Sequence, residues 1–170
     1  MKLLVKKLWF PHSVDDVVEA LFRIPQMQER FDEGYKYDGE MRPREIKICS
    51  GYWPADKIMA RLSNQKDRVY VILTSVDLRG DVGRIHGKGR EGIAIASSNG
   101  YTGGRGFVTD DVGFNAMAFG EIGHALGIEH HKFDSANPCE MSHNQYPGPD
   151  WQTLDEIRFC DECYTKISRR

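Results

Sequence analysis

The chain has 170 residues, 40% of them hydrophobic and 11% aromatic, which is enough apolar material for one core but too little length for two comfortable domains. Its 23 basic and 25 acidic side chains leave a formal charge of −2, so the basic surface typical of nucleic-acid-binding proteins is not expected. Lys6 and Lys7 interrupt the first apolar stretch, and no apolar run reaches the roughly 18 residues of a membrane span. We therefore expect one cytoplasmic domain that binds neither nucleic acid nor membrane.

Alternating strand and helix signals fill the first half of the chain. Residues 3–9 are apolar and compatible with a strand, and Ser13 is placed to cap a helix whose apolar residues follow at helical spacing. Pro54 begins a second predicted helix, which extends to about Leu62. Residues 68–74 (RVYVILT) give the strongest strand signal and are typical of a strand buried on both faces.

The intervening segments are less regular. Residues 25–45 are polar and contain glycines and prolines, which predicts a loop or an irregular hairpin. Residues 46–49 predict a short strand, and residues 93–97 predict another strand after a glycine-rich stretch. The expected order is strand, helix, strand, helix, strand, strand.

The glycine-rich stretch contains Gly87-x-Gly89-x-x-Gly92, which fits the dinucleotide-binding pattern. That pattern needs a helix N-terminus directly after the glycines to hold a pyrophosphate, whereas a strand is predicted there. We therefore interpret these glycines as part of a turn between strands.

The clearest helix lies in the second half of the chain. Residues 112–126 place apolar side chains at helical spacing, and Gly127 is positioned to end this helix as a left-handed cap. Residues 128–150 contain several prolines and glycines and predict a loop. Thr153 begins a final predicted helix.

Three of the four cysteines lie in the last quarter of the chain. Cys160-Asp-Glu-Cys163 sits near the C-terminus, whereas a thioredoxin-like redox motif follows an early strand, so a metal half-site is favoured over a redox pair. Cys139 lies upstream of this pair. Cys49 stands alone and is expected to be a buried small residue without a metal role.

Metal-binding residue types gather where the predicted helix ends. Glu121 and His124 are three residues apart on the helix, so their side chains can face one cavity. Gly127 then allows a sharp turn that returns His130 toward His124. Two imidazoles and a carboxylate form the set that zinc hydrolysis uses, because the imidazoles bind the ion and the carboxylate accepts a proton from water.

Together with the residues that follow, this pattern resembles the metzincin zinc peptidases, whose signature is His-Glu-x-x-His-x-x-Gly-x-x-His followed by a methionine-containing turn. Among them it is most similar to the archaemetzincins, which carry a metal-type residue directly after the last His, then Cys-x-Met, then Cys-x-x-Cys. The corresponding residues here are His130-His131, Cys139-Glu140-Met141 and Cys160-x-x-Cys163. The resemblance covers residues 114–163.

The resemblance implies an α/β, metzincin-like fold with a mixed twisted sheet, an active-site helix and a small, mostly irregular C-terminal subdomain. Residues 1–170 would form one metallopeptidase-like domain, divided into an N-terminal α/β subdomain (1–127) and a C-terminal subdomain (128–170) that contains a structural zinc. The protein would be a monomer with a peptide or protein substrate.

The resemblance also assigns roles to the residues. Glu121 would be the general base that activates a zinc-bound water for peptide hydrolysis. His124 and His130 would bind the catalytic zinc, and Met141 would form the turn beneath it. Residues 93–97 would be the edge strand that holds an extended peptide by main-chain pairing.

One position departs from the family pattern. The first histidine ligand is expected at position 120, which is Gly120, and glycine offers no ligand atom. Catalytic zinc normally has three protein ligands. The site is therefore degraded, or His86 or His143 supplies the missing ligand, or another metal or a substrate group completes the sphere.

The second zinc site departs less. Its four ligands would be His131, Cys139, Cys160 and Cys163, a closed Cys₃His set of the structural type. Seven residues separate His131 from Cys139, where the family has four, and His143 is the alternative to His131.

Two functions from different classes are consistent with the sequence. The first is an archaemetzincin-like zinc metallopeptidase in which Gly120 impairs the catalytic zinc site. The alternative is a catalytically silent peptide-binding relative that keeps the structural zinc alone. The number of zinc ions bound per chain separates the two.

Overall fold

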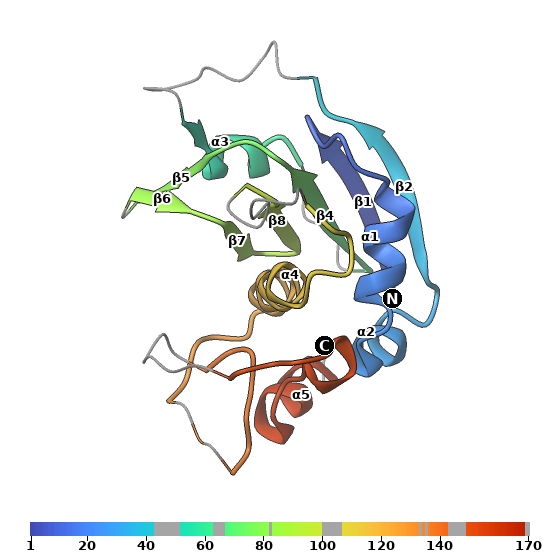
Figure 1. Ribbon diagram of the computed structural model, residues 1–170, viewed down its shortest axis with the longest axis vertical. Helices are drawn as coiled ribbons and strands as arrows, with labels where there is room; N and C mark the ends of the chain where they lie inside the picture. The colour runs from blue at the N-terminus through green and yellow to red at the C-terminus, as the bar shows by residue number, and fades with distance from the viewer. Residues whose placement is uncertain are drawn as a thin grey trace.

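The computed structural model describes residues 1–42, 52–62, 67–81, 83–99, 107–132, 134, 136–142 and 149–168. Its centre is a five-stranded sheet in the order β2-β1-β4-β8-β7 (Figure 1). The strands are β1 Lys2–Leu8, β2 Tyr35–Glu40, β4 Arg68–Thr74, β7 Gly87–Arg90 and β8 Ile93–Ser97. The first four in the sheet are parallel, and β7 pairs antiparallel with β8. This mixed sheet with its helices confirms the predicted fold class.

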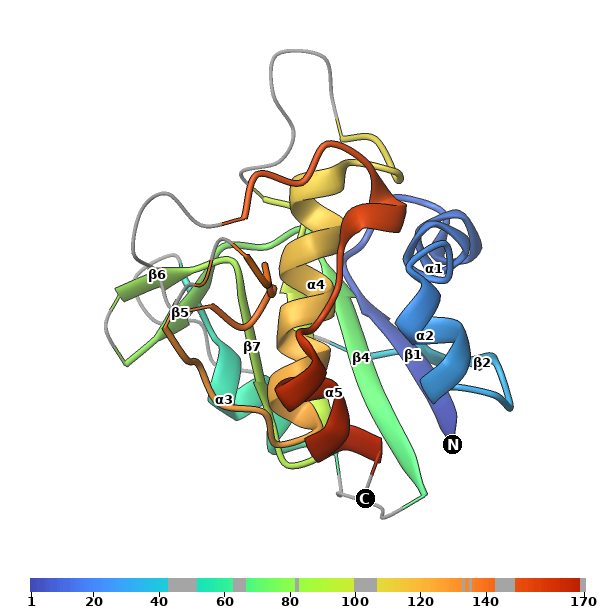
Figure 2. The same cartoon turned by 90° about the horizontal axis from the view of Figure 1, so that it is seen from below.

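Helices cover both faces of this sheet. One face carries α1 Val14–Leu21, α2 Pro25–Arg30 and α4 Val112–Ala125, and α5 Asp161–Ser168 lies beside α4 (Figure 2). The other face carries α3 Ala55–Met59 and a small sheet of β3 Trp53–Pro54, β5 Leu78–Gly80 and β6 Gly83–Ile85. A single 3-10 turn, Leu154–Glu156, precedes α5 among the described residues.

The alternation of side chains along the strands divides the core into two layers. In β4, Val69 and Val71 pack toward α1 and α4, whereas Tyr70 and Ile72 pack toward α3. All of these side chains are at most 9% exposed, so β4 is buried on both faces, as the sequence predicts. In β8 the side facing α4 carries alanines, and their small size lets the helix lie close to the sheet.

Side-chain caps define where the helices begin. The Ser13 hydroxyl accepts a hydrogen bond from the Asp16 amide at 3.2 Å, which confirms the predicted start of α1. The Asp111 carboxylate accepts one from the Phe114 amide at 2.7 Å and starts α4. The predicted α3 is present but ends at Met59, three residues before the expected Leu62.

Two predictions about irregular segments are wrong. Residues 25–45 contain α2 and the edge strand β2, which the polar sequence of β2 conceals because much of that strand faces solvent. The last helix begins at Asp161, not at Thr153, because Thr153 caps only the 3-10 turn through a reciprocal bond with Glu156. The strand predicted over 46–49 lies outside the described residues.

The prediction that the Gly87-x-Gly89-x-x-Gly92 stretch is a turn between strands is correct only for Gly92. Gly87 and Gly89 lie in β7, and Glu91 and Gly92 form the turn into β8 with positive φ angles of 49° and 79°. No helix follows the glycines, because β8 begins at Ile93. The stretch therefore lacks the helix N-terminus that a dinucleotide site requires.

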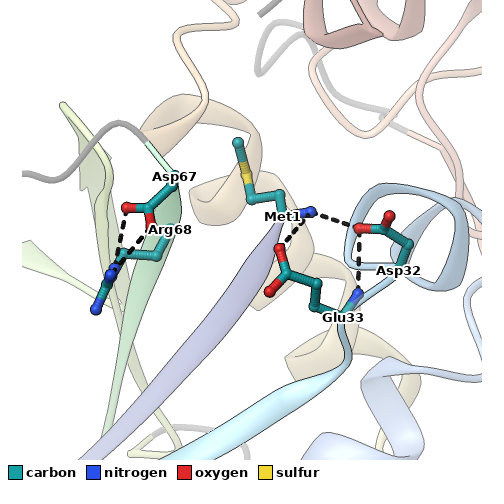
Figure 3. A network of polar contacts seen from close by, with 5 residues as sticks. All are labelled: Met1, Asp32, Glu33, Asp67 and Arg68. Carbon is teal, nitrogen blue, oxygen red and sulfur yellow. Dashed lines mark hydrogen bonds and ion pairs between the residues drawn. The ribbon is translucent and has the colours of Figure 1, made fainter.

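Charged groups gather at the amino-terminal ends of β1 and β4 (Figure 3). The Met1 amine contacts Asp32 and lies 3.4 Å from Glu33, and Arg68 pairs with Asp67 at 3.0 Å. The carboxylates are exposed, so these pairs contribute little to stability. Among the described helices, none has the length and apolar character that crossing a membrane demands.

Candidate active site and metal centre

The C-terminus of α4 brings two histidines together. Gly127 has a φ of +82°, and two bonds close a Schellman-type cap, from the Gly127 amide to His124 and from the Ile128 amide to Gly123, both at 2.9 Å. The chain thereby reverses direction beyond the helix and returns His130 to His124. Their Nε2 atoms lie 3.1 Å apart. The predicted glycine cap and the predicted convergence of the two rings are both present.

Backbone carbonyls fix the orientation of both rings. His124 Nδ1 donates to the Ile128 carbonyl at 2.9 Å, and His130 Nδ1 donates to the Met141 carbonyl at 3.3 Å. Because a carbonyl oxygen only accepts, each neutral ring carries its lone pair on Nε2. Two facing lone pairs repel unless a proton or a metal cation lies between them. Burial lowers the pKa of His124, which disfavours the proton.

The separation of these nitrogens fits a shared zinc ion. Two imidazoles on a tetrahedral zinc, with Zn–N bonds of about 2.0–2.1 Å, place their nitrogens roughly 3.3 Å apart. Hydrogen bonding of the opposite ring nitrogen to a carbonyl is also the usual arrangement for a metal-binding histidine. The pair His124 and His130 therefore supplies two ligands of the right type and spacing.

Glu121 stands beside this pair in a cavity. The cavity has a volume of about 320 Å³ and lies between α4, β7 and the β5–β6 hairpin, with Glu121, His124, Lys88 and Asp81 among its lining residues. Burial, and then the nearby charge of Glu140, raise the pKa of Glu121 to about 7, while Lys88 lowers it. A carboxylate with that pKa can both accept and return a proton near neutral pH.

The edge strand beside the cavity is β7. We expected residues 93–97 at the edge, and this is wrong, because β8 lies between β4 and β7 in the sheet. Two glycines allow β7 to approach the helix. A Cβ on Gly89 would lie 1.8 Å from the Glu121 carbonyl oxygen, and a Cβ on Gly87 would lie 2.6 Å from the Glu121 Cγ. The short β7 was missed because glycines interrupt its strand signal.

Gly120 lies beside the carboxylate of Glu140, which the sequence did not indicate as a site residue. A Cβ on Gly120 would lie 3.3 Å from Glu140 Cγ and 3.4 Å from Glu140 Oε1. The Trp151 indole donates to Glu140 Oε2 at 2.7 Å, and burial raises the pKa of Glu140 to about 7. No local signal identifies Glu140, since its contact with Gly120 arises only from the folding of the tail against α4.

The predicted cysteine site is assembled. His131, Cys139, Cys160 and Cys163 place their ligand atoms within 4.8 Å of one another. The three cysteines are buried and form no disulfide. Cys160 Sγ lies 3.5 Å from His131 Nε2, and the Cys160 amide donates to Cys139 Sγ at 3.1 Å. Among the described residues, this is the one group of three or more metal-ligating side chains whose ligand atoms all lie within that distance of one another.

This group fits zinc. Three sulfurs and one imidazole nitrogen make a tetrahedral, closed ligand set. Burial raises the pKa of Cys139 and of Cys163, so both thiols stay protonated in a metal-free protein. A metal ion would take up this set as thiolates with release of protons.

Met141 packs against α4 and bonds to the segment of His130 and His131. It is fully buried, and a Cβ on Gly123 would lie 2.9 Å from its sulfur. Its carbonyl accepts from His130 Nδ1 and from the His131 amide at 3.1 Å. The Met141 carbonyl therefore fixes the segment that carries His130 and His131.

Among the other candidates, the structure describes His86 alone. His86 Nδ1 contacts the Asn99 carbonyl at 3.0 Å, and His86 does not line the cavity beside Glu121. His143 and Cys49 lie outside the described residues, so their predictions are neither confirmed nor contradicted.

No protein-family model and no curated protein matches the chain. Solved structures do. Archaemetzincin from Archaeoglobus fulgidus, in complex with malonate, is 21% identical, has a TM-score of 0.66, and the alignment covers 98% of this chain and 99% of that one. Archaemetzincin from Methanopyrus kandleri is 18% identical with a TM-score of 0.65 and coverage of 99% and 94%.

A zinc-dependent peptidase from Methanocorpusculum labreanum is 17% identical with a TM-score of 0.62 and coverage of 96% and 99%. At this level of identity the likeness concerns the course of the backbone. It extends over almost the whole of each chain. The protein described here therefore has the fold of the archaemetzincins.

Proposed function

We propose that this protein is a zinc-dependent peptidase whose active site is formed by Glu121, His124 and His130. The observation that carries the proposal is the 3.1 Å separation of the two Nε2 atoms, with Glu121 and His124 lining one cavity. A zinc ion, when bound, supplies Lewis acidity that polarises a carbonyl and lowers the pKa of water. The zinc-dependent peptidase among the structural neighbours supports the same assignment.

The chain's own residues perform the remaining tasks. Glu121 accepts a proton from the attacking water at its carboxylate and delivers it to the leaving amine. The outer edge of β7 binds an extended peptide through main-chain hydrogen bonds, which positions a scissile bond beside Glu121. Lys88 anchors β7 through its bonds to Asp56 at 2.7 Å and Asp81 at 3.4 Å.

The Cys₃His group has a structural role in this proposal. His131, Cys139, Cys160 and Cys163 would hold a zinc ion, which would tie the segment of His130 and His131 to the tail that carries Cys160 and Cys163. Side chains from residues 1–127 and from residues 128–170 share one apolar cluster, and the stacked rings of Phe119 and Phe159, 4.0 Å apart, lie where the two parts meet. We propose that the two parts work as subdomains of a single monomeric domain.

A silent peptide-binding protein is the second candidate, and the glycine at position 120 favours it. Hydrolysis of a mixed set of fluorogenic peptides distinguishes the two. In a peptidase, Glu121→Gln lowers kcat/KM by about 10²–10⁴-fold, the usual contribution of a general base. Glu129→Gln, which removes an exposed carboxylate near His130, leaves kcat/KM unchanged.

The zinc content and melting temperature of Glu121→Gln should equal those of the unaltered protein. Peptide binding without any turnover by the zinc-loaded protein would contradict the peptidase and support the silent alternative.

A further inference from the structure

The side chain of Glu140 fills the space that a side chain at position 120 would use. Its Cγ and Oε1 lie 3.3 and 3.4 Å from the Cβ that Gly120 lacks. Residue 120 precedes Glu121 on α4, whereas Glu140 comes from the tail beyond the loop. The Glu140 carboxylate from the tail therefore lies where a side chain at position 120 of the helix would lie.

The backbone of Glu140 is fixed in this position, while its side chain can turn. Its amide donates to the Arg158 carbonyl at 2.9 Å, and its neighbours Cys139 and Met141 are fully buried. The Trp151 indole holds Oε2 at 2.7 Å. Oε1 makes no hydrogen bond to the part of the chain that the structure describes. One oxygen is thus anchored, and the other is available to a cation.

The chemistry of this oxygen suits the neighbouring histidines. A mostly buried carboxylate is costly unless a proton or a cation compensates its charge. Carboxylate oxygens bind zinc at about 2.0–2.2 Å, and two histidines with one glutamate are an established set of ligands for catalytic zinc. His124 and His130 present the two nitrogens, and they lack a third ligand.

We propose that Glu140 is the third protein ligand of the zinc bound by His124 and His130, and that it compensates for the missing side chain of Gly120. This inference rests on the proposed function, because it concerns the same ion. Within the described residues, the Cys₃His group alone has all its ligand atoms within 4.8 Å, so Glu140 reaches the ion by turning its carboxylate about its own side-chain bonds.

Trp151 is a positioning residue in this arrangement. Its indole N–H donates to Oε2 of the Glu140 carboxylate and leaves Oε1 unengaged by this bond. Trp151→Phe keeps an aromatic ring but removes the N–H. It should weaken zinc binding by less than the loss of the carboxylate itself, since interactions that orient a ligand are worth about 10 to 100-fold in metal affinity.

The experiment measures zinc per chain by equilibrium dialysis against buffers of fixed free zinc concentration, followed by elemental analysis. The unaltered protein should bind two zinc ions, one of them at the Cys₃His group. Glu140→Gln keeps the size of the side chain and an acceptor for Trp151, and should weaken only the second ion, by at least about 10-fold. The control Glu129→Gln should bind both ions like the unaltered protein.

A rescue variant tests the compensation directly. Gly120→His combined with Glu140→Ala replaces the oxygen ligand by an imidazole and removes the side chain with which that imidazole would collide. This double variant should recover the second zinc. The comparison is Glu140→Ala alone, which should lack the second zinc, because neither the carboxylate nor an imidazole at position 120 is then present.

Two results would overturn the inference, and they differ in whether the proposed peptidase function fails as well. If the unaltered protein binds two ions and Glu140→Gln binds them equally tightly, Glu140 is not a ligand, and the proposed peptidase stands with another third ligand. If the unaltered protein binds one ion and the double variant binds two, Glu140 blocks the site instead, and the zinc peptidase proposal fails with it. The melting temperature of each variant, measured with the Cys₃His zinc in place, excludes unfolding as the cause.

Discussion

His124 and His130 point their Nε2 atoms at each other across 3.1 Å, while the opposite ring nitrogen of each contacts a backbone carbonyl. Neither Nε2 atom can donate a hydrogen bond to the other, so their lone pairs repel unless a proton or a metal cation lies between them. The helix cap at Gly127 imposes the arrangement, since it returns the chain to the helix within six residues. The fold therefore brings together two nitrogens of the kind that a cation binds.

Removal of either ring should abolish one zinc site and spare the other. His124→Gln and His130→Gln are each expected to lose one zinc per chain, because one imidazole and the Glu140 carboxylate are too few ligands to hold the ion tightly. His86→Gln is the matched control and should retain the zinc content of the unaltered protein, since His86 contacts the Asn99 carbonyl away from the pair. Elemental analysis after dialysis gives the answer. An equal loss in the His86 variant would mean that His86 reaches the ion.

Loss of the Cys₃His zinc should destabilise the protein strongly. Structural zinc sites contribute apparent binding free energies on the order of 10 kcal/mol, and each kcal/mol corresponds to about 2–4 °C in a domain of this size. A strong chelator, or Cys163→Ser, should therefore lower the melting temperature by more than about 10 °C. Cys49→Ser should leave the zinc content unchanged. A melting curve that is the same with and without chelator would exclude a structural role for this site.

The glycine at position 89 should tolerate no side chain. A Cβ there would lie 1.8 Å from the Glu121 carbonyl oxygen, which belongs to helix backbone and cannot move aside cheaply. We expect Gly89→Ala to cost about 3 kcal/mol or more in the free energy of unfolding, because β7 must leave the helix. Gly120→Ala is the comparison, and it should change stability by less than about 1 kcal/mol, since its Cβ meets only the movable side chain of Glu140. Urea denaturation measures both, and similar costs would show that β7 does not pack as described.

The cap of the active-site helix should have a measurable effect. Asp111 accepts a hydrogen bond from the Phe114 amide at 2.7 Å, so Asp111→Ala should lower the free energy of unfolding by about 1 kcal/mol. Asp110→Ala removes an exposed neighbouring carboxylate and should have almost no effect. Thermal denaturation of the two variants at equal zinc content provides the test. Equal melting temperatures would show that the start of α4 does not depend on this bond.

Local signals predicted the parts of this fold that local physics determines. The helix that ends at Gly127 and the doubly buried strand β4 follow from apolar spacing and from one glycine. The Cys₃His set followed from the spacing of its cysteines, seen through the resemblance to a known family. In each case the residues that decide the structure lie close together in the chain or carry a distinctive chemical type.

Tertiary contacts determined what the sequence did not predict. β7 was missed, and the edge was assigned to β8, because Gly87 and Gly89 have no strand propensity and are explained only by the helix they touch. The polar strand β2 is stabilised by its pairing with β1, not by its own pattern. Glu140 became visible as a partner of Gly120 only when the tail was placed against α4.

Three consecutive residues of the tail each contact a different part of the protein. Cys139 belongs to the Cys₃His group, Glu140 lies beside Gly120, and the Met141 carbonyl contacts His130 Nδ1. Inserting or deleting one residue within this tripeptide would therefore shift at least one of these contacts out of place. The loop before the tripeptide has seven residues between His131 and Cys139 where the family has four, so these contacts constrain the order within the tripeptide and not the length of the loop.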